Sequence, residues 1–254
     1  MFTGALINFL YPPYGISRPI STIPLIITIT VIVLLLCFIY FLRNKDRVIS
    51  FPVNKYLFSP SLLLLLLIPF LSIFGAYQLT FQDSNSLLLF MFGIISMVPL
   101  LVAFNKFPEN AYPFIVWIVS ISLLLQTSLA GEYVTVCGDA SHEFYYSKVV
   151  LENGRWNPVI PTNLNAMLRI VILHPIFSKL LGMSLTWEFK IIHPLIFSLV
   201  PVGLYFVYKA QTNAKIAFYS SFLFMTMFPF FNILAMNSRT GTAFFYIMLL
   251  LLLT

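Results

Sequence analysis

Long apolar runs constrain this chain more than any other feature of its sequence. The hydrocarbon core of a bilayer is about 30 Å thick, so a helix needs about 20 apolar residues to cross it. A further apolar run opens at Thr242 and continues to the end of the sequence. The runs that reach spanning length are Ser21–Leu42, Leu57–Leu79, Ser86–Phe104, Tyr112–Ala130, Ile191–Tyr208 and Ile216–Ala235.

These runs define the fold class. In lipid, every backbone polar group must pair within the protein, which leaves helices or closed barrels as solutions. Barrel strands alternate apolar and polar residues, and these runs do not. We predict an all-α, polytopic helical membrane protein with about seven transmembrane helices and one structured extracytoplasmic loop. We treat residues 1–254 as a single membrane domain. Because the last run is cut at Thr254, we expect a piece of a longer protein, and a cut at the N-terminus stays open.

Composition excludes a soluble domain. The chain is 60% hydrophobic and 9% charged, whereas a soluble domain carries roughly 25% charged residues. The net charge of +6 could point to nucleic acid in a soluble protein. Here the bases sit mostly in short loops, as membrane orientation requires, so we expect membrane lipid around the chain and no nucleic acid partner. Cys37 and Cys137 are too few for a disulfide framework or a metal-binding cysteine pair.

The distribution of Lys and Arg predicts the orientation. The loop after the first run carries Arg43, Lys45, Arg47 and Lys55 against one acid, which places it in the cytoplasm. Alternating crossings then place the loop 131–190 outside the cell membrane.

The segment Leu168–Met183 needs separate treatment. If it crossed the bilayer, Lys209 and Lys215 would fall outside, against the positive-inside rule. It is short and interrupted by His174-Pro175, so we predict a helix that lies in the membrane interface. We interpret His174 and His193, each followed by Pro, as helix ends or kinks. Three bases near this segment could bind a lipid phosphate or extend to headgroups, and we favour headgroups: Arg169, Lys179 and Lys190.

The outer loop contains a predicted helix. Gly138-Asp139 is a helix start, with Asp139 or Ser141 as the N-cap, and Asn153-Gly154 is a helix stop. The spacing places five residues on one face of this helix: Asp139, His142, Glu143, Tyr146 and Val150.

Two interpretations of this face stay open. Two carboxylates, an imidazole and a phenol could hold a divalent cation or supply a general base. Alternatively, they form the solvated face that any interfacial amphipathic helix needs. A zinc protease motif is excluded because position 146 is Tyr rather than His.

The same residues carry a resemblance. Asp139, Glu143 and Tyr146, followed by Gly154-Arg155-Trp156-Asn157-Pro158, resemble the first outer loop of C-type (GT-C) glycosyltransferases. These polytopic enzymes take a sugar from a polyprenyl-phosphate donor outside the cytoplasmic membrane. His174-Pro175 and Leu180-Leu181-Gly182 are similar to the family's juxtamembrane helix, and the likeness covers about 112 to 254.

Most of the chain also resembles an archaeal family of predicted membrane proteins from methanogens, whose function is unknown. Three segments carry this likeness: Asn165–Leu168, Leu185–Ile192 and Phe197–Pro201.

The glycosyltransferase resemblance implies roles for particular residues. Asp139 would be a metal ligand or catalytic base, and Glu143 a second ligand or acceptor-orienting group, with Mg or Mn as the metal. The implied substrate-binding residues are His142, Tyr146, Arg155, Trp156 and Arg239. The segment Met236–Gly241 lacks the acid that many such enzymes carry in the second outer loop, so a non-catalytic transporter-like or scaffold subunit stays the alternative.

Arg155 and Trp156 have two interpretations of their own. The guanidinium could bind a phosphate and the indole could stack on a sugar. Equally, the pair could be a turn followed by an interfacial anchor.

Overall fold

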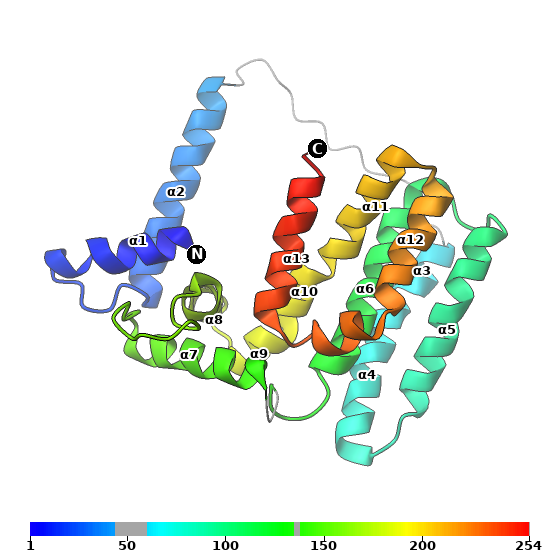
Figure 1. Cartoon of the computed structure of the whole chain (residues 1–254), viewed down its shortest axis with the longest axis horizontal. Helices are drawn as coiled ribbons and strands as arrows, with labels where there is room; N and C mark the ends of the chain where they lie inside the picture. Colours follow the sequence, from blue (N-terminus) through cyan, green and yellow to red (C-terminus); the bar gives the residue numbers. More distant parts are fainter. Residues whose placement is uncertain (44–59, 135–137, 254) are drawn as a thin grey trace. The chain divides into compact units, whose positions relative to one another are not determined.

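The computed structural model describes residues 1–43, 60–134 and 138–253. Within these ranges all regular secondary structure is helical (Figure 1). The predicted all-α class is confirmed. Most of the basic loop predicted after the first run, and Cys137, lie outside the described residues.

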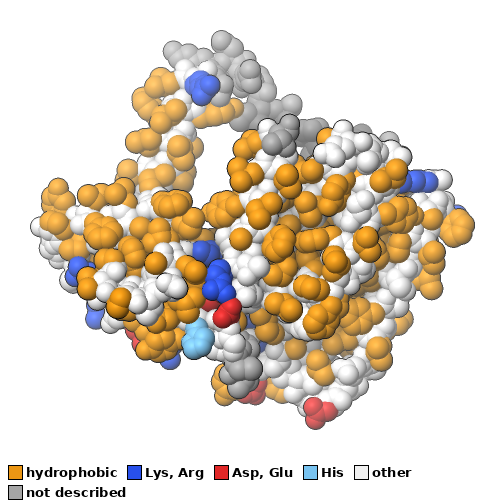
Figure 2. All heavy atoms as spheres, viewed as in Figure 1, with side chains coloured by type: hydrophobic (Ala, Val, Ile, Leu, Met, Phe, Trp, Pro, Cys, Tyr) orange, Lys and Arg blue, Asp and Glu red, His pale blue; other side chains and the backbone are white. Residues whose placement is uncertain are grey.

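Five helices in the described part are long and apolar enough to cross a membrane. Each matches a predicted run, although the last begins six residues earlier than expected. The chain is therefore a polytopic helical membrane protein, and the total of about seven crossings stays a prediction. These helices are Thr22–Arg43, Leu62–Gln82, Ser86–Ala103, Glu109–Ser128 and Leu185–Gln211. Figure 2 shows hydrophobic side chains over most of the visible face, with charged side chains in few places.

The predicted run Ile216–Ala235 is not one continuous α-helix. Helix α12 (Ala214–Thr226) is followed by Met227, whose backbone is extended, and then by the π-helical turn η6 (Pro229–Ile233). Pro229 has no N–H to continue the hydrogen-bond ladder, which explains the break. Helix α13 (Ser238–Leu251) occupies the run that opens at Thr242.

The chain divides into two compact units, where the sequence predicted one membrane domain. Unit 1 comprises Met1–Asn54 and His142–Leu185, and unit 2 comprises Lys55–Ser141 and Thr186–Thr254.

Unit 1 contains one long membrane helix and several shorter helices. Its core is an apolar cluster centred on Ile20, Ile170 and Val171, against which Trp156 also packs. Its elements are α1 (Phe2–Leu10), η1 (Pro12–Tyr14), α2 (Thr22–Arg43), most of α7 (Asp139–Asn153), η4 (Arg169–Leu173) and α8 (His174–Leu181).

Unit 2 is a helical bundle around α6 (Tyr112–Ser128), which packs against α4, α11 and α12. Most of α6 is buried, whereas its neighbours are exposed on their outer sides. Buried serines allow close packing, and Ser72 Oγ donates to the carbonyl oxygen of Ser122 (2.7 Å). The other elements are α3 (Pro60–Leu65), α4 (Leu67–Gln82), α5 (Ser86–Ala103), η3 (Glu109–Ala111), α9 (Leu185–Trp187), η5 (Glu188–Ile192), α10 (His193–Phe197), α11 (Leu199–Gln211), α12, η6 and α13.

Contacts identify the two ends of unit 2. At one end, Lys190 Nζ donates to the Gly131 carbonyl, and Gly131 N donates to Thr80 Oγ1 (2.9 Å). At the other end, Tyr219 Oη donates to the Pro99 carbonyl (3.0 Å). The chain thus leaves α6 and enters the next long helix at the same end of unit 2. If Leu168–Met183 lies in the interface and does not cross the bilayer, as predicted, the chain must re-enter the membrane on the side where it left α6, which requires this arrangement.

The two His-Pro pairs occupy equivalent local positions. The π-helical turn η4 leads directly into α8 at His174-Pro175, and η5 leads directly into α10 at His193-Pro194. A proline within a helix removes one hydrogen bond and its ring displaces the carbonyl four residues earlier. A wider π turn relieves this clash. Both histidines are buried, and the prediction of helix irregularities at these positions is confirmed.

Candidate functional site

Helix α7 forms as the sequence predicts, from Asp139 to Asn153. Gly138 precedes it with a φ of +88°, and Gly154 follows it with a φ of +64°. Both values lie in the left-handed region, which glycine adopts without steric cost, so these residues fix the ends of the helix.

The side chains of α7 do not share one environment. Asp139 and His142 are exposed, whereas Glu143 and Val150 are buried and Tyr146 is intermediate. The expected single polar face is corrected accordingly. At 100° per residue, positions 142 and 143 differ by about 100°, so the boundary between solvent and core passes between them.

Asp139 pairs with Arg239. Both residues belong to unit 2. The Asp139 carboxylate accepts a hydrogen bond from the Arg239 guanidinium, and the two groups form an ion pair. Arg239 lies in the first turn of α13, where Asn237 Oδ1 caps the helix by accepting from Thr240 N (3.2 Å). The Asp139 side chain is 59% exposed and that of Arg239 is 35% exposed, so solvent can reach the pair.

Glu143 lies one turn further along α7 and is fully buried. Ser147 Oγ lies 2.8 Å from the carbonyl oxygens of both Glu143 and Ile170. This hydroxyl therefore connects α7 to η4 within unit 1. Burying a carboxylate costs free energy unless the group is hydrogen-bonded or protonated. A buried acid such as Glu143 is therefore unusual in a protein core.

Tyr146 and His142 have different surroundings. Tyr146 packs against the core of unit 1, and its ring centroid lies 5.5 Å from that of Tyr145. His142 is exposed. Of the predicted substrate-binding residues on α7, His142 is exposed and Tyr146 is not.

Trp156 belongs to the core of unit 1, which corrects the expectation that its indole stacks on a sugar. Only 9% of its surface is exposed, and Nε1 donates to the carbonyl oxygen of Asn165 (3.0 Å). Its backbone N donates to Asn8 Oδ1 (2.9 Å), and its carbonyl accepts from Asn8 Nδ2 (2.8 Å). These contacts assign Trp156 to holding α1 against the segment after α7.

Arg155 is exposed and lines a polar pocket of about 400 Å³ in unit 1. Arg18, from the segment between η1 and α2, lines the same pocket. Nothing in the sequence links Arg18 to Arg155, more than a hundred residues away, so the sequence does not reveal Arg18 as part of this pocket.

A metal at Asp139 and Glu143 gains no further ligand from the described residues. In that part of the chain, no group of three or more His, Cys, Asp or Glu side chains is placed to hold a metal ion. The metal therefore stays a prediction.

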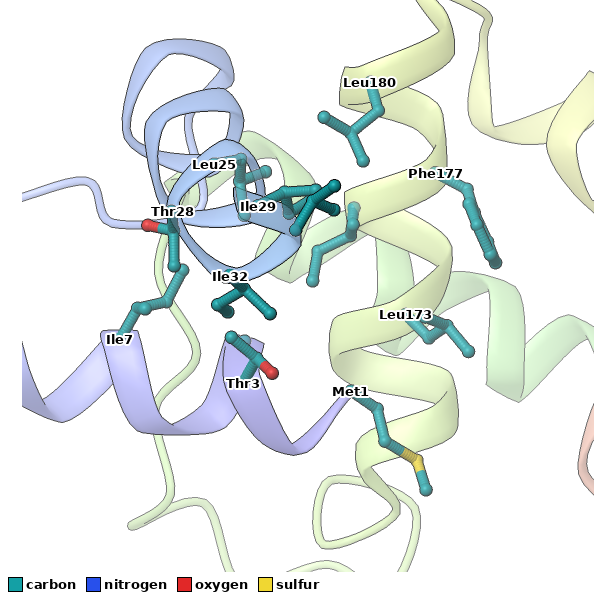
Figure 3. A pocket seen from close by; sticks show the side chains of 13 residues that line it. Met1, Thr3, Ile7, Leu25, Thr28, Ile29, Ile32, Leu173, Phe177 and Leu180 are labelled. Carbon is teal, nitrogen blue, oxygen red and sulfur yellow. The ribbon is translucent and has the colours of Figure 1, made fainter. Parts of the chain in front are cut away.

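Two further cavities are lined mainly by apolar residues. One, of about 360 Å³, lies between α1, α2 and the η4–α8 segment of unit 1. Figure 3 shows Ile7 of α1, Leu25 and Ile29 of α2, and Leu180 of α8 around it.

The other cavity, of about 300 Å³, lies in unit 2 where α4 and α6 end. Trp187 and Lys190 line it, with the ammonium 5.9 Å from the indole centroid. Lys190 is 3% exposed, so the expectation that it extends to headgroups is wrong. Its sequence context gives no signal of this, since a base near a helix end ordinarily reaches solvent.

The fold defines a polytopic α-helical membrane protein with an acid–arginine pair at one end of its larger unit. No family model, curated protein or solved structure matches this chain.

Proposed function

We propose that this chain is a membrane glycosyltransferase of the C type, which transfers a sugar from a polyprenyl-phosphate donor to an acceptor at the outer face of the cell membrane. The observation that supports it best is the pair of Asp139 and Arg239. An acid that can accept a proton lies beside a cation that can bind a phosphate, at the end of unit 2 where α6 finishes.

The proposed reaction uses these two groups in different roles. The acceptor hydroxyl attacks the anomeric carbon of the donor sugar, and the bond from that carbon to the phosphate oxygen breaks. Asp139 takes the proton of the acceptor hydroxyl, and Arg239 balances the charge on the leaving polyprenyl phosphate. For Asp139 to act, its hydrogen bond to Arg239 must open when the phosphate binds.

The proposed reaction assigns no direct chemical role to Glu143 or to the predicted Mg or Mn. Glu143 is buried and Asp139 is exposed and paired, so the two carboxylates do not present a matched pair of ligands. No step of the proposed reaction passes through a metal. Glu143 would position α7 at its buried side and act on the reaction only through Asp139.

The test is transfer by the purified full chain in detergent, with a set of polyprenyl-phosphate sugars as donors. Asp139→Asn should lower the rate by roughly 10²- to 10⁴-fold, the usual contribution of a general base. Asp83→Asn is the matched control, because Asp83 lies in the exposed turn between α4 and α5 and should leave transfer unchanged. Transfer by Asp139→Asn at the rate of the unmutated chain would overturn the proposal.

The second candidate is a non-catalytic subunit of transporter-like or scaffold type. One observation favours it: Asp139 is already paired with Arg239. A catalytic base must instead be free to accept a proton. Arg239→Gln discriminates the two: an enzyme should lose donor binding, whereas a scaffold should keep its assembly with partner proteins unchanged. Polyprenyl phosphate that stays bound through purification of the unmutated chain would also favour the enzyme.

A further inference from the structure

A donor-rich pocket lies at the end of α7 in unit 1. It has a volume of about 400 Å³, and no carboxylate lines it. Guanidinium, amide and hydroxyl groups converge there, which is a set suited to an anion with several oxygens. The lining residues are Ser17, Arg18, Asn153, Arg155 and Asn157.

Gly154 brings the two arginines together. A Cβ at Gly154 would lie 3.0 to 3.4 Å from the Cβ, Cγ and Cδ atoms of Arg18, so the stem of Arg18 lies directly on this glycine. Ile20 N donates to the Gly154 carbonyl (2.9 Å), which fixes the segment before α2 to the end of α7. Arg155 follows Gly154 in the chain and therefore reaches the same pocket.

The backbone on the far side of Arg155 is also fixed. Trp156 is held by both hydrogen bonds to Asn8, and Asn165 Nδ2 donates to the Asn157 carbonyl (2.8 Å). Asn157 Oδ1 accepts from Val159 N (3.1 Å), so its amide N–H groups are left to donate elsewhere. The donors are therefore carried by anchored backbone, which lowers the entropic cost of binding an anion.

Neither guanidinium is neutralised within the described part of the chain. Arg18 and Arg155 make no side-chain hydrogen bond or ion pair with described residues, and the neighbouring acid Glu152 pairs with Lys148 (3.8 Å). Two cations in one pocket repel each other, and a bound anion would remove that repulsion. Arginine is the side chain best suited to phosphate, because its planar fork donates two parallel hydrogen bonds.

The surroundings indicate where such a phosphate comes from. On α1, Phe2, Leu6 and Phe9 are exposed, while Gly4, Ile7 and Asn8 face the unit. A helix with one exposed apolar side suits the bilayer interface. Tyr14 is also exposed and comes four residues before Arg18, and tyrosine is enriched at the level of the headgroups.

We infer that Arg18 and Arg155 bind the phosphate of an anionic lipid headgroup. The site involves neither Asp139 nor Arg239, and it stands whether or not the chain transfers a sugar. Asn153, Asn157 and Ser17 would donate further hydrogen bonds to the headgroup oxygens.

The experiment uses the full chain in a neutral detergent, with short-chain phosphatidylglycerol added to it and binding followed by native mass spectrometry. The variants are Arg18→Gln, Arg155→Gln and their combination. Arg43→Gln, at the exposed end of α2, is matched in charge and lies outside the pocket. Inorganic phosphate at the same concentration, followed by calorimetry, separates a lipid headgroup from a free anion.

Each single variant should weaken lipid binding roughly tenfold, as expected for loss of a charge-assisted hydrogen bond. The double variant should abolish it, whereas Arg43→Gln should change it less than twofold. Equal binding by the double variant and Arg43→Gln would overturn the inference. Inorganic phosphate bound as tightly as the lipid would overturn the lipid assignment.

A second measurement needs no variant and so does not depend on the folding of one. Phenylglyoxal modifies accessible arginines, and the modified positions can be read by peptide mass spectrometry. Phosphatidylglycerol should protect Arg18 and Arg155 in the unmutated chain but leave Arg43 reactive. Modification of Arg18 and Arg155 at the same rate with and without lipid would contradict the site.

Discussion

The carboxylate of Asp139 accepts a hydrogen bond from the guanidinium of Arg239, although the two residues stand 100 positions apart in the chain. The contact joins the start of α7 to the start of α13. Because both side chains are partly open to solvent, its contribution to the stability of the fold should be small.

A double-mutant cycle measures that contribution. With Asp139→Asn, Arg239→Gln and the combined variant, we expect a coupling free energy of about 0.2–1 kcal/mol at low salt, the range of exposed ion pairs. Chemical unfolding in detergent, repeated at high salt, checks this value, since screening should reduce it. A coupling several times larger would mean that the pair is shielded from solvent.

Gly241 allows α13 to approach His193 of α10 closely. A Cβ at this position would lie 2.6 Å from His193 Cε1 and 3.4 Å from Phe197 Cδ2. His193 cannot easily move, because its Nε2 donates to the Leu234 carbonyl (3.1 Å). We expect Gly241→Ala to destabilise the protein by about 1–3 kcal/mol, as overpacking does.

Gly93→Ala is the control for this prediction. Gly93 lies inside α5, and apart from its chain neighbours and the nearby backbone of its own helix, no atom of the described structure lies within 4 Å of an added Cβ. Alanine favours a helix over glycine, so this variant should be neutral or more stable by up to about 1 kcal/mol. Thermal unfolding of both variants compares them directly, and equal melting temperatures would argue against close packing at Gly241.

Asn8 satisfies the backbone of Trp156 through two hydrogen bonds. Asn8→Ala would leave a buried N–H and a buried carbonyl without these partners, and we expect a loss of about 1–3 kcal/mol. Unfolding should be followed by far-UV circular dichroism. Asn163→Ala, at an exposed position, should have no measurable effect. An Asn8→Ala variant as stable as Asn163→Ala would show that α1 is held by other contacts.

The predicted orientation can be tested with single cysteines in a chain lacking Cys37 and Cys137. Asn85 precedes α5 and Gln211 is the last residue of α11, at opposite ends of unit 2, and Val159 is 80% exposed in unit 1. In intact cells, a membrane-impermeant maleimide should label Asn85→Cys and Val159→Cys. Gln211→Cys should react only after permeabilisation, because it adjoins the basic turn predicted inside.

Two outcomes of that labelling would contradict different statements. If Asn85→Cys and Gln211→Cys react from the same side, the arrangement of helices in unit 2 is wrong. If all three accessibilities are reversed, the arrangement of helices is correct but the orientation predicted from Lys and Arg is wrong. The proposed site would then face the cytoplasm, away from the outer face where the donor is proposed to be used.

The membrane helices could be predicted from sequence because bilayer thickness fixes their length and composition. The bounds of α7 could be predicted because glycines at both ends take conformations that other residues avoid. The break between α12 and η6 was not predicted, because hydropathy alone defined the run Ile216–Ala235 and the helix-breaking effect of Pro229 was not used.

The candidate site was less predictable. Spacing placed Glu143 and His142 on one face, but only the packing of unit 1 decides which side of that face is buried. Trp156 has both an apolar ring and a polar N–H, so its sequence context suits a core position as well as a ligand contact. The partners of Asp139 and of Arg155 come from distant segments, and a single sequence does not link them.

Helices α2 and α6 are expected to tolerate change very differently. In the described structure, 6% of the α2 membrane window is buried, against 72% for α6. Exchanges among Leu, Ile, Val and Phe along α2 should therefore be almost neutral, because lipid accepts any apolar shape. The same exchanges in α6 alter interlocking volumes. Over evolutionary time α2 can drift in identity while it keeps its length and hydrophobicity, and α6 is the helix whose sequence should record common ancestry longest.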